Sequence, residues 1–507
     1  MFFYFFSYFF SCKLCVIILL MADNIEKSEL LTDNKTSPLI PIEELERRLH
    51  EVSVNYFLRD LRKDRESYYA LTYEEIVRTQ SWFCFSGLTL NLIMDGKLEE
   101  AWHIIESLPE DKGFFLKLLK IGLTIVHPEI TWKQFVSCIE YLKSINTPLK
   151  YVMLTAGRPL LLNGFNDFSR LGPLLLKHRE MFVDYLKYLY PESLCPYIYN
   201  LCLAEYYYQT NSLVDAAMLV GSTIKKFNIE GENRIIFAAL YLQSRILLAH
   251  GKSVRSESFI QDIRNCTGEA GKAEFDYNID AVSVLFSLYE GNIARVKEWL
   301  SGDAPDEFAD FNLLDLYRYM VKMRCYIATR KYAAVIALAE RLRPYLAAGR
   351  RFMDLCEQDL ILALSLFAAK NNKAAFEALR NALKKVRMYR YYRLVADEGE
   401  PMLHLLIEYI KTEGKSPFLM NLLDMTRSMA IRHPLYMKVP CQKGDGLTQM
   451  EIDILTLLEQ GKSKEEIAEY FFISVNTVKY HIKNVYVKLG VKTATQAVWN
   501  ARILGII

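Results

Sequence analysis

The sequence predicts an all-α protein, in which a solenoid of helix pairs precedes a small four-helix domain. Three observations support this fold class. Glycine (22 residues) and proline (15 residues) are both scarce, which disfavours the turn-rich sandwiches and barrels. Helical hairpins recur along the middle of the chain at a spacing close to 40 residues. Near the C-terminus, two capping boxes open two successive short helices.

Composition places the chain among ordinary globular proteins. Its 507 residues suggest about three domains. The 51% hydrophobic and 24% charged residues are typical of folded domains, and the 13% aromatic residues argue against intrinsic disorder. Because 62 Lys and Arg face 60 Asp and Glu, the formal net charge is only +2. This balance argues against a polycationic nucleic-acid coat, but it leaves room for a small basic face.

The ten cysteines are scattered through a long chain, unlike the dense cysteines of a disulfide scaffold. Cys12 and Cys15 form one CxxC, but no second Cys or His pair follows at the spacing of zinc ligands. We therefore expect buried, reduced thiols, no metal site, and a cytoplasmic protein.

The first segment, residues 1–20, is apolar at 17 of 20 positions and is about long enough to span a bilayer. It lacks the basic start and the small-residue cleavage site of a secretory signal, and acidic rather than basic residues follow it. Because Met21 opens an ordinary N-terminus, a misassigned start codon is the favoured interpretation. A membrane anchor, if residues 1–20 are translated, stays open as the alternative.

The region from 42 to 431 is expected to be an α-helical repeat domain. An amphipathic helix is predicted from about residue 41 to 62, and hairpins of an aromatic-rich helix, a short polar turn and an Ala/Leu-rich helix follow. The last five turns centre on Asn211, Gly251, Gly291, Arg330 and Asn371, which gives gaps of 40, 40, 39 and 41 residues. Such a period is typical of stacked helix pairs, although an irregular all-α domain is the alternative. Residues 110–190 do not fit the period.

The C-terminal segment, residues 447–507, has clear helix signals, and residues 432–446 are predicted to be a flexible linker before it. Thr448 with Glu451 and Ser463 with Glu466 form the capping boxes of the first two helices. Ile452, Leu455 and Leu458 are expected to form the apolar face of the first helix. We expect Gly461 to end that helix, and the second helix to run through Phe471.

Ser474 is expected to cap a third helix that reaches about Leu489, and a fourth helix is expected from about Thr493 to Leu504. The third helix has an apolar inner face and a polar, basic outer face. Its inner face is formed by Val478, Ile482, Val485 and Leu489, and its outer face by Asn476, Lys479, Tyr480 and Lys483.

Charge is divided sharply within this segment. Residues 447–470 carry 2 basic and 6 acidic side chains (net −4), whereas residues 471–507 carry 5 basic and no acidic side chains (net +5). Two short helices with a tight turn between them, the second with a basic outer face, are typical of a helix-turn-helix. Keeping acidic groups off the recognition helix avoids repulsion by DNA phosphates. A merely solvated basic face is the alternative.

These residues resemble the LuxR/GerE-type DNA-binding domain over all 61 positions. The shared motif consists of Leu447-Thr448 with Glu451, Gly461-x-Ser463, Glu466-Ile467-Ala468, Ile473-Ser474, Thr477-Val478-Lys479-x-His481-Ile482 and Lys488-Leu489-Gly490-Val491. The resemblance implies that Lys479, Tyr480 and Lys483 reach base edges in the major groove of double-stranded DNA. It also implies that Asn476, Thr477 and Lys488 hold phosphates.

Two positions depart from the LuxR/GerE pattern. Met450 and Ala494 stand where the family often has arginine, and the second change is expected to remove one phosphate contact. His481 is expected to be a packed, hydrogen-bonding motif residue. The fourth helix, with Val498 and Leu504, matches the usual dimer surface of the family, so a homodimer on DNA is expected.

The repeats at about 190–410 resemble the tetratricopeptide-like (TPR-like) effector region of MalT-type regulators, and residues 393–402 resemble the element that closes it. Gly-Lys-Ser occurs at 251–253, 414–416 and 461–463, but the glycine five positions earlier that a P-loop needs is absent each time. The sequence thus resembles a MalT-type regulator without its N-terminal ATPase. No catalytic residues and no cofactor site are expected, and the protein is predicted not to be an enzyme.

The resulting hypothesis is a sequence-specific DNA-binding transcriptional regulator whose repeat domain senses a small-molecule or protein effector. The alternative is a helical-repeat interaction scaffold whose helix-turn-helix-like domain does not bind DNA. A second basic and aromatic cluster at residues 384–393 could pair with nucleic acid, but a solvated end of the last repeat helix is the favoured interpretation.

Overall fold

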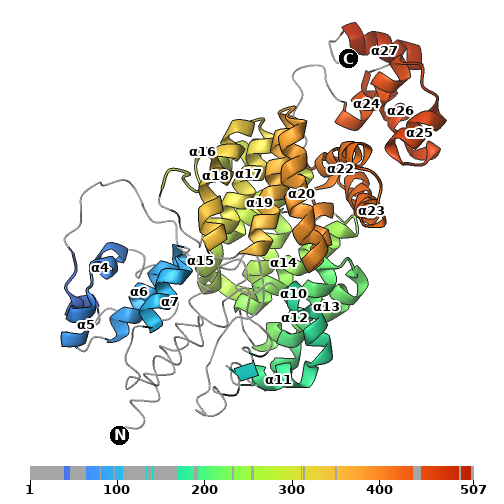
Figure 1. The fold of residues 1–507 in the computed structure, drawn as a ribbon. Coiled ribbons are helices and arrows are strands. Elements are labelled where there is room, and N and C mark those ends of the chain that lie inside the picture. Colours follow the sequence, from blue (N-terminus) through green and yellow to red (C-terminus); the bar gives the residue numbers. More distant parts are fainter. Residues whose placement is uncertain are drawn as a thin grey trace.

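The structure is a computed structural model in which every regular element of the described residues is a helix, so the all-α prediction is confirmed (Figure 1). It describes residues 39–45, 64–79, 82–95, 97–106, 133, 136–137, 140, 168–187, 192–230, 233–252, 256–309, 311, 315–348, 351–437, 447–489, 491, 493–503 and 507. The apolar segment 1–20 lies outside these ranges. So does most of the irregular region 110–190.

The first described helices are short. The chain is helical at residues 42–45, as expected for the start of the 41–62 helix, and the rest of that helix lies outside the described residues. The helices that follow, drawn in blue in Figure 1, are α4 (Arg65–Tyr69), α5 (Tyr73–Thr79), α6 (Trp82–Met94) and α7 (Leu98–Glu106).

The central helices stack as antiparallel hairpins, the TPR-like arrangement that the 40-residue period predicts. Figure 1 shows them side by side from green through yellow to orange. Their bounds are α10 (Phe168–Lys177), α11 (Arg179–Leu186), α12 (Cys195–Gln209), α13 (Leu213–Glu230), α14 (Asn233–Ala249), α15 (Ser256–Glu290), α16 (Ile293–Ser301), α17 (Leu316–Ala328), α18 (Tyr332–Ala348), α19 (Phe352–Ala368) and α20 (Asn372–Tyr389).

The hairpin turns each place one residue in the left-handed conformation. These residues are Asn211, Gly251, Gly291, Arg330 and Lys370, with φ from 61° to 78°. The first four are the predicted turn centres. The fifth prediction, Asn371, is wrong by one position, because the Asn371 side chain instead accepts the Ala374 N–H and caps α20. An asparagine suits both positions, so its identity alone did not decide between them.

Helix α15 differs from the sequence expectation. The repeat period predicts one helix after the Gly251 turn and a separate one before the Gly291 turn, whereas the structure has a single helix of 35 residues, Ser256–Glu290. No proline interrupts this segment, and Gly268 and Gly271 only weaken a helix by about 1 kcal/mol each. Two consecutive hairpins therefore share one continuous helix.

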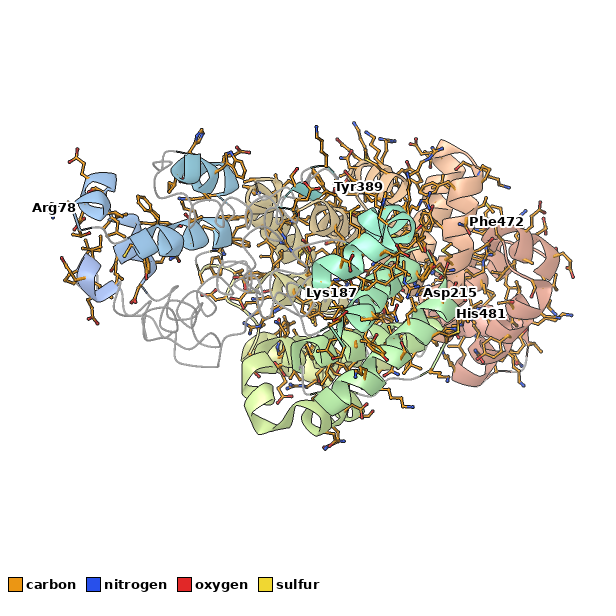
Figure 2. All side chains as sticks on the ribbon, turned by 90° about the horizontal axis from the view of Figure 1, so that it is seen from below. Arg78, Lys187, Asp215, Tyr389, Phe472 and His481 are labelled. Carbon is orange, nitrogen blue, oxygen red and sulfur yellow. The ribbon has the colours of Figure 1, made fainter. Side chains whose placement is uncertain are left out.

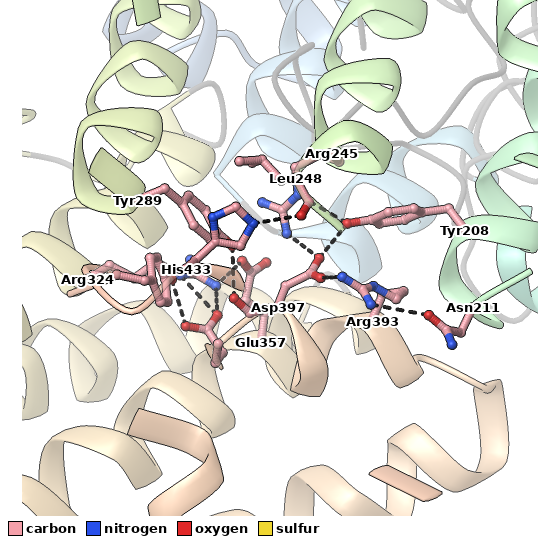
Figure 3. A network of polar contacts seen from close by, with 12 residues as sticks. Tyr208, Asn211, Arg245, Leu248, Tyr289, Arg324, Glu357, Arg393, Asp397 and His433 are labelled. Atoms are coloured by element: carbon pink, nitrogen blue, oxygen red, sulfur yellow. Dashed lines mark hydrogen bonds and ion pairs between the residues drawn. The ribbon is translucent and has the colours of Figure 1, made fainter. Parts of the chain in front are cut away.

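An ionic network closes the inner side of the solenoid, where α21 (Tyr392–Ala396) meets α22 (Gly399–Glu413). Asp397 pairs with Arg393 and Arg245 (Figure 3); Asp397 and Arg393 are buried and Arg245 is half-buried. Burial opposes ionisation, but the two guanidinium groups outweigh it and hold the pKa of Asp397 below its ordinary value. Beside it, Arg324 pairs with both Glu357 and Glu398. This network lies in the segment expected to close the repeat region.

After α23 (Pro417–Arg432) the chain runs across the ends of earlier helices. We call residues 432–437 the closing segment. Arg432 donates to the Ala249 carbonyl, and the His433 ring lies 2.6 Å from the Leu248 carbonyl oxygen. Tyr436 stacks on Tyr289, with ring centroids 4.2 Å apart, and donates to Glu398. The start of the predicted 432–446 linker is therefore packed against the solenoid, and residues 438–446 lie outside the described residues.

The C-terminal domain has the four predicted helices, α24 (Gln449–Glu459), α25 (Lys464–Phe471), α26 (Val475–Leu489) and α27 (Ala494–Ile503). Both capping boxes are present, with reciprocal hydrogen bonds at Thr448–Glu451 and Ser463–Glu466. The predicted apolar face of α24 needs correction. Leu455 is buried, but the other predicted positions, 452 and 458, are only partly buried, whereas Met450 and Ile454 are buried.

Several smaller predictions can be compared with the structure. Five cysteines whose side chains the structure describes are buried, as expected: Cys84, Cys195, Cys202, Cys325 and Cys356. Burial raises the pKa of the Cys195 thiol to about 11, which keeps it protonated. Among the described helices, none is both long and apolar enough to cross a membrane.

The basic cluster at 384–393 is in part the solvated helix end that the sequence favours, because Lys384, Arg387 and Arg390 are exposed, but some of its cations also have partners within the protein. Arg393 is 3% exposed and pairs with Asp397. Arg390 donates to the Tyr206 hydroxyl, and Lys385 pairs with Asp359 at 3.1 Å. The contacts of Arg390 and Lys385 therefore join α20 and its C-terminal end to α12 and α19.

Candidate nucleic-acid interface

The turn before α26 fixes where the recognition helix begins. Phe472 ends α25 in the left-handed conformation (φ 55°). Two residues later, the Ser474 hydroxyl accepts the Thr477 N–H at 3.1 Å, so Ser474 caps α26 as predicted. The same hydroxyl lies 2.8 Å from the Thr477 hydroxyl. A cap at this point leaves the first turn of α26 with N–H groups available to an anion.

The buried face of α26 sets the rotation of the helix. Val478, Ile482 and Val485 are at most 5% exposed. Val478 and Ile482 pack into the core with Ile467 and Phe471 of α25, and Val485 packs with Leu455 of α24 and Ala497 of α27. This burial fixes the direction of the opposite face, because side chains four positions apart share one side of a helix.

Four of the predicted DNA-contacting residues lie together on the outer face of α26. Asn476, Lys479, Tyr480 and Lys483 are all exposed, and the Tyr480 side chain is 62% exposed despite its size. Thr477 lies beside them, half-buried against its cap. The arrangement presents two ammonium groups, an amide and a phenol on about two turns of helix. This donor chemistry suits base edges and phosphates.

Lys488 lies apart from this face and has a partner of its own. Its ammonium group is 2.6 Å from Glu451, whose side chain is only 2% exposed and also accepts the Thr448 N–H in the capping box. Lys488 thus neutralises a buried carboxylate that holds α24 in place. Its phosphate-binding role stays a prediction.

His481 is half-buried and touches the Tyr480 ring edge to face, with centroids 5.7 Å apart. Burial lowers the pKa of His481, so the imidazole is neutral at pH 7. A neutral, packed ring agrees with the expected structural role of this motif residue.

The C-terminal domain docks on α22 and the turn that follows it, and Figure 1 shows it next to this part of the solenoid. Met450, which replaces an arginine of the family pattern, is 5% exposed, and its N–H donates to Glu400 of α22 at 3.4 Å. His404 of α22 lies 3.4 Å from Asp453 of α24. Burial works against protonation of His404, but Glu400 and Asp453 outweigh it and raise the pKa of His404 above its ordinary value.

Two lysines of the solenoid complete this contact, and sequence reasoning missed both. The Lys411 ammonium lies 3.5 Å from the centre of the Tyr470 ring, and that of Lys415 lies 4.6 Å from the centre of the Phe472 ring. Both are cation–π contacts across the interface. The signal in the sequence is the aromatic run 470–472, which is longer than the small core of the C-terminal domain needs. Figure 2 labels Phe472 and His481 within this domain, at the end of the molecule opposite Arg78.

The fold and this surface define a helical-repeat protein with a C-terminal helix-turn-helix. Comparison with known protein families supports this assignment of both regions. Residues 445–501 match the family described as bacterial regulatory proteins, luxR family, and residues 193–412 match the MalT-like TPR region. The chain therefore carries a luxR-type helix-turn-helix domain downstream of a MalT-like TPR region. The first of these families is a regulator domain and the second a repeat region, and neither is an enzyme family.

Proposed function

We propose that this protein is a sequence-specific DNA-binding transcriptional regulator whose solenoid, within residues 42–431, senses a small-molecule or protein effector. The observation that carries the proposal is the exposed face of α26, where Asn476, Lys479, Tyr480 and Lys483 lie together on a domain of luxR type. In this proposal residues 447–507 bind DNA and residues 432–446 connect the two regions.

The roles follow from side-chain chemistry and position. Lys479 and Lys483 are one turn apart on the outer face, where they donate to guanine O6 and N7 in the major groove. Tyr480, between them, contributes a hydroxyl and an apolar ring edge. Asn476 and Thr477, at the capped start of the helix, bind phosphates together with the local N–H groups.

The docked position of the domain supports this role. Contacts to the solenoid come from α24 and from the end of α25, through Met450, Asp453, Tyr470 and Phe472. The outer face of α26 stays exposed while these contacts are made. In this proposal the protein binds DNA with its C-terminal domain still docked.

We propose that two copies bind one operator through α27. Val498 is partly buried against the core of its own domain, whereas the neighbouring Trp499 is 66% exposed. Leu504 lies outside the described residues. A large exposed aromatic side chain on the last helix is the kind of group that a second copy would bury.

The test is a comparison of DNA binding by two double variants of the full chain. Lys479→Ala with Lys483→Ala should weaken binding to genomic fragments by roughly 30-fold or more, because each base contact contributes about 1–3 kcal/mol. Lys225→Ala with Lys373→Ala, which removes the same charge from exposed positions of the solenoid, should leave the affinity within about twofold.

Circular dichroism of both variants should match that of the wild type. Equal affinity for DNA in the two double variants would contradict the proposal and favour the alternative, a repeat scaffold whose helix-turn-helix does not bind DNA.

A further inference from the structure

A cavity of about 840 Å³ lies where the solenoid meets the C-terminal domain. The repeat turns after α17 and α19 line it on the solenoid side, together with α22 and the closing segment. Helices α24 and α25 line it on the other side. Small-molecule sites are typically about 300–1,000 Å³ and often lie at domain interfaces. Because both regions supply its walls, the complete cavity exists only while the C-terminal domain is docked.

Much of the lining is apolar. It includes Ile327, Leu364, Phe367, Ile407, Ile452 and Leu457. Four of these side chains come from the solenoid and two from α24. A ligand that fills this space must therefore have a substantial apolar body.

The acidic groups of the cavity already have partners. Glu400 accepts the Met450 N–H, and Asp453 accepts from the Gln449 amide at 2.8 Å and lies beside His404. Glu408 pairs with Lys411 at 2.8 Å. Each of these carboxylates therefore already has a hydrogen-bond donor or a cation of the protein beside it.

Unlike these carboxylates, the two cations on the solenoid side of the cavity have no ion-pair or hydrogen-bond partner for their side chains in the described part of the chain. Arg330 and Lys370 line the cavity at the tips of two successive repeat turns. Within the described residues, neither side chain has an ion pair or a hydrogen bond. The positive charge that the cavity presents without a partner therefore comes from these two groups.

The backbone conformation of Arg330 and Lys370 is a second reason to consider them as ligand-binding residues. Both are left-handed, with φ of 61° and 65°, a region that favours glycine. The corresponding turns away from the cavity use Asn211, Gly251 and Gly291. Long cations thus occupy the less favourable conformation at the two turns beside the cavity. Local strain of this kind is often retained at ligand sites.

Arg390 provides the contrast within the same chain. It is also left-handed, with φ of 61°, but its guanidinium donates to the Tyr206 hydroxyl, so a contact inside the protein accounts for it. The Arg330 and Lys370 side chains make no such contact within the described residues.

We propose that this cavity binds a small organic anion with an apolar body, with the anionic group on Arg330 and Lys370 and the body against the apolar lining. Because α24 and α25 form part of the wall, the ligand stabilises the docked position of the C-terminal domain. That this ligand is the effector rests on the sensing role proposed above, whereas the site itself does not.

The test uses the fluorescent apolar anion 1-anilinonaphthalene-8-sulfonate as the probe, titrated into the full-length protein. Arg330→Gly with Lys370→Gly removes both charges and replaces them with the residue that the left-handed turn favours, so the melting temperature should not fall. The affinity for the probe should fall by about tenfold or more, as expected for the loss of charge-assisted hydrogen bonds.

Arg390→Gly is the matched control, because it removes a cation from a left-handed turn outside the cavity. It should leave probe affinity unchanged. Equal probe affinity in the Arg330→Gly/Lys370→Gly variant and the wild type would overturn the proposal.

Competition tests the charge of the ligand. Decanoate should displace the probe from the wild type, whereas decylamine, which has the same chain length and the opposite charge, should not. Displacement by decylamine as efficient as that by decanoate would also overturn the proposal.

A last measurement separates this proposal from the proposed function. Lys479→Ala with Lys483→Ala should bind the probe like the wild type, whatever that variant does to DNA binding. A shift in DNA affinity at saturating decanoate supports the effector role. Probe binding that depends on Arg330 and Lys370, without such a shift, supports the site and contradicts the effector role alone.

Discussion

Two groups of cations in this molecule have opposite surroundings. Around Asp397 and Glu398, the arginines of the solenoid are buried or half-buried, and each meets a carboxylate. On the outer face of α26, Lys479 and Lys483 are exposed, and residues 471–507 contain no acidic residue at all. The first group neutralises itself and holds the fold. The second keeps its charge available to a partner, which the near-zero net charge of the whole chain conceals.

The largest effect is expected from breaking the buried group. Asp397→Ala leaves the buried Arg393 and the half-buried Arg245 without their shared carboxylate, which should lower the free energy of unfolding by about 3–5 kcal/mol. Denaturant unfolding followed by circular dichroism measures this. Asp424→Ala removes an exposed carboxylate paired with Arg427, and it should change stability by less than about 0.5 kcal/mol. Similar losses in both variants would show that burial does not distinguish these ion pairs.

An intermediate loss of stability is expected for Lys488→Ala. Like the arginines around Asp397, Lys488 neutralises a buried carboxylate, whereas Lys479 and Lys483 pair with no described carboxylate. Lys488→Ala leaves Glu451, 2% exposed, without its cation and should destabilise the protein by about 1–3 kcal/mol. Lys483→Ala, on the outer face of the same helix, should change stability by less than about 0.5 kcal/mol. Thermal unfolding of the two variants makes the comparison. No loss of stability in Lys488→Ala would contradict the structural role of the Lys488–Glu451 pair.

The smallest effect concerns His404, which lies among Glu400, Glu408 and Asp453 at the docking contact. Because its folded pKa is raised, protonated His404 contributes stability that is complete below its unfolded pKa, about 6.5, and is lost as the pH rises through the folded pKa. Wild type should therefore lose up to about 1 kcal/mol more than His404→Gln between pH 5.5 and pH 8.

Thermal unfolding at a series of pH values measures that difference, and subtracting His404→Gln removes the opposite contributions of His433 and His481, whose pKa values burial lowers. A difference between the two proteins that does not vary with pH would contradict the assignment.

The sequence was sufficient to predict the structural features that depend on residues close together in the chain. Capping boxes, left-handed turns and the inner and outer faces of α26 all involve residues within about one helical turn, so spacing was enough to find them. The placement of Asn371 shows the limit of this reasoning, because two local roles suit the same side chain.

Contacts between distant residues were not predictable in this way. Lys488 and Glu451 are 37 positions apart, and Met450 and Glu400 are 50 apart. The resemblance predicted a phosphate-binding role for Lys488, and it marked Met450 only as a departure from the pattern. Their partners became visible when the folded chain brought α24 against α26 and against α22.

Helix α15 has a mechanical consequence. Its 35 residues form a rod about 52 Å long that belongs to two hairpins at once. Those two hairpins cannot rotate relative to one another unless helix in the middle of the rod melts. Any change in the curvature of the solenoid is therefore directed to junctions where successive helices are separate, such as those flanking α18 and α19. The Arg330 and Lys370 turns lie at these junctions, so the walls of the cavity belong to the part of the solenoid that can bend.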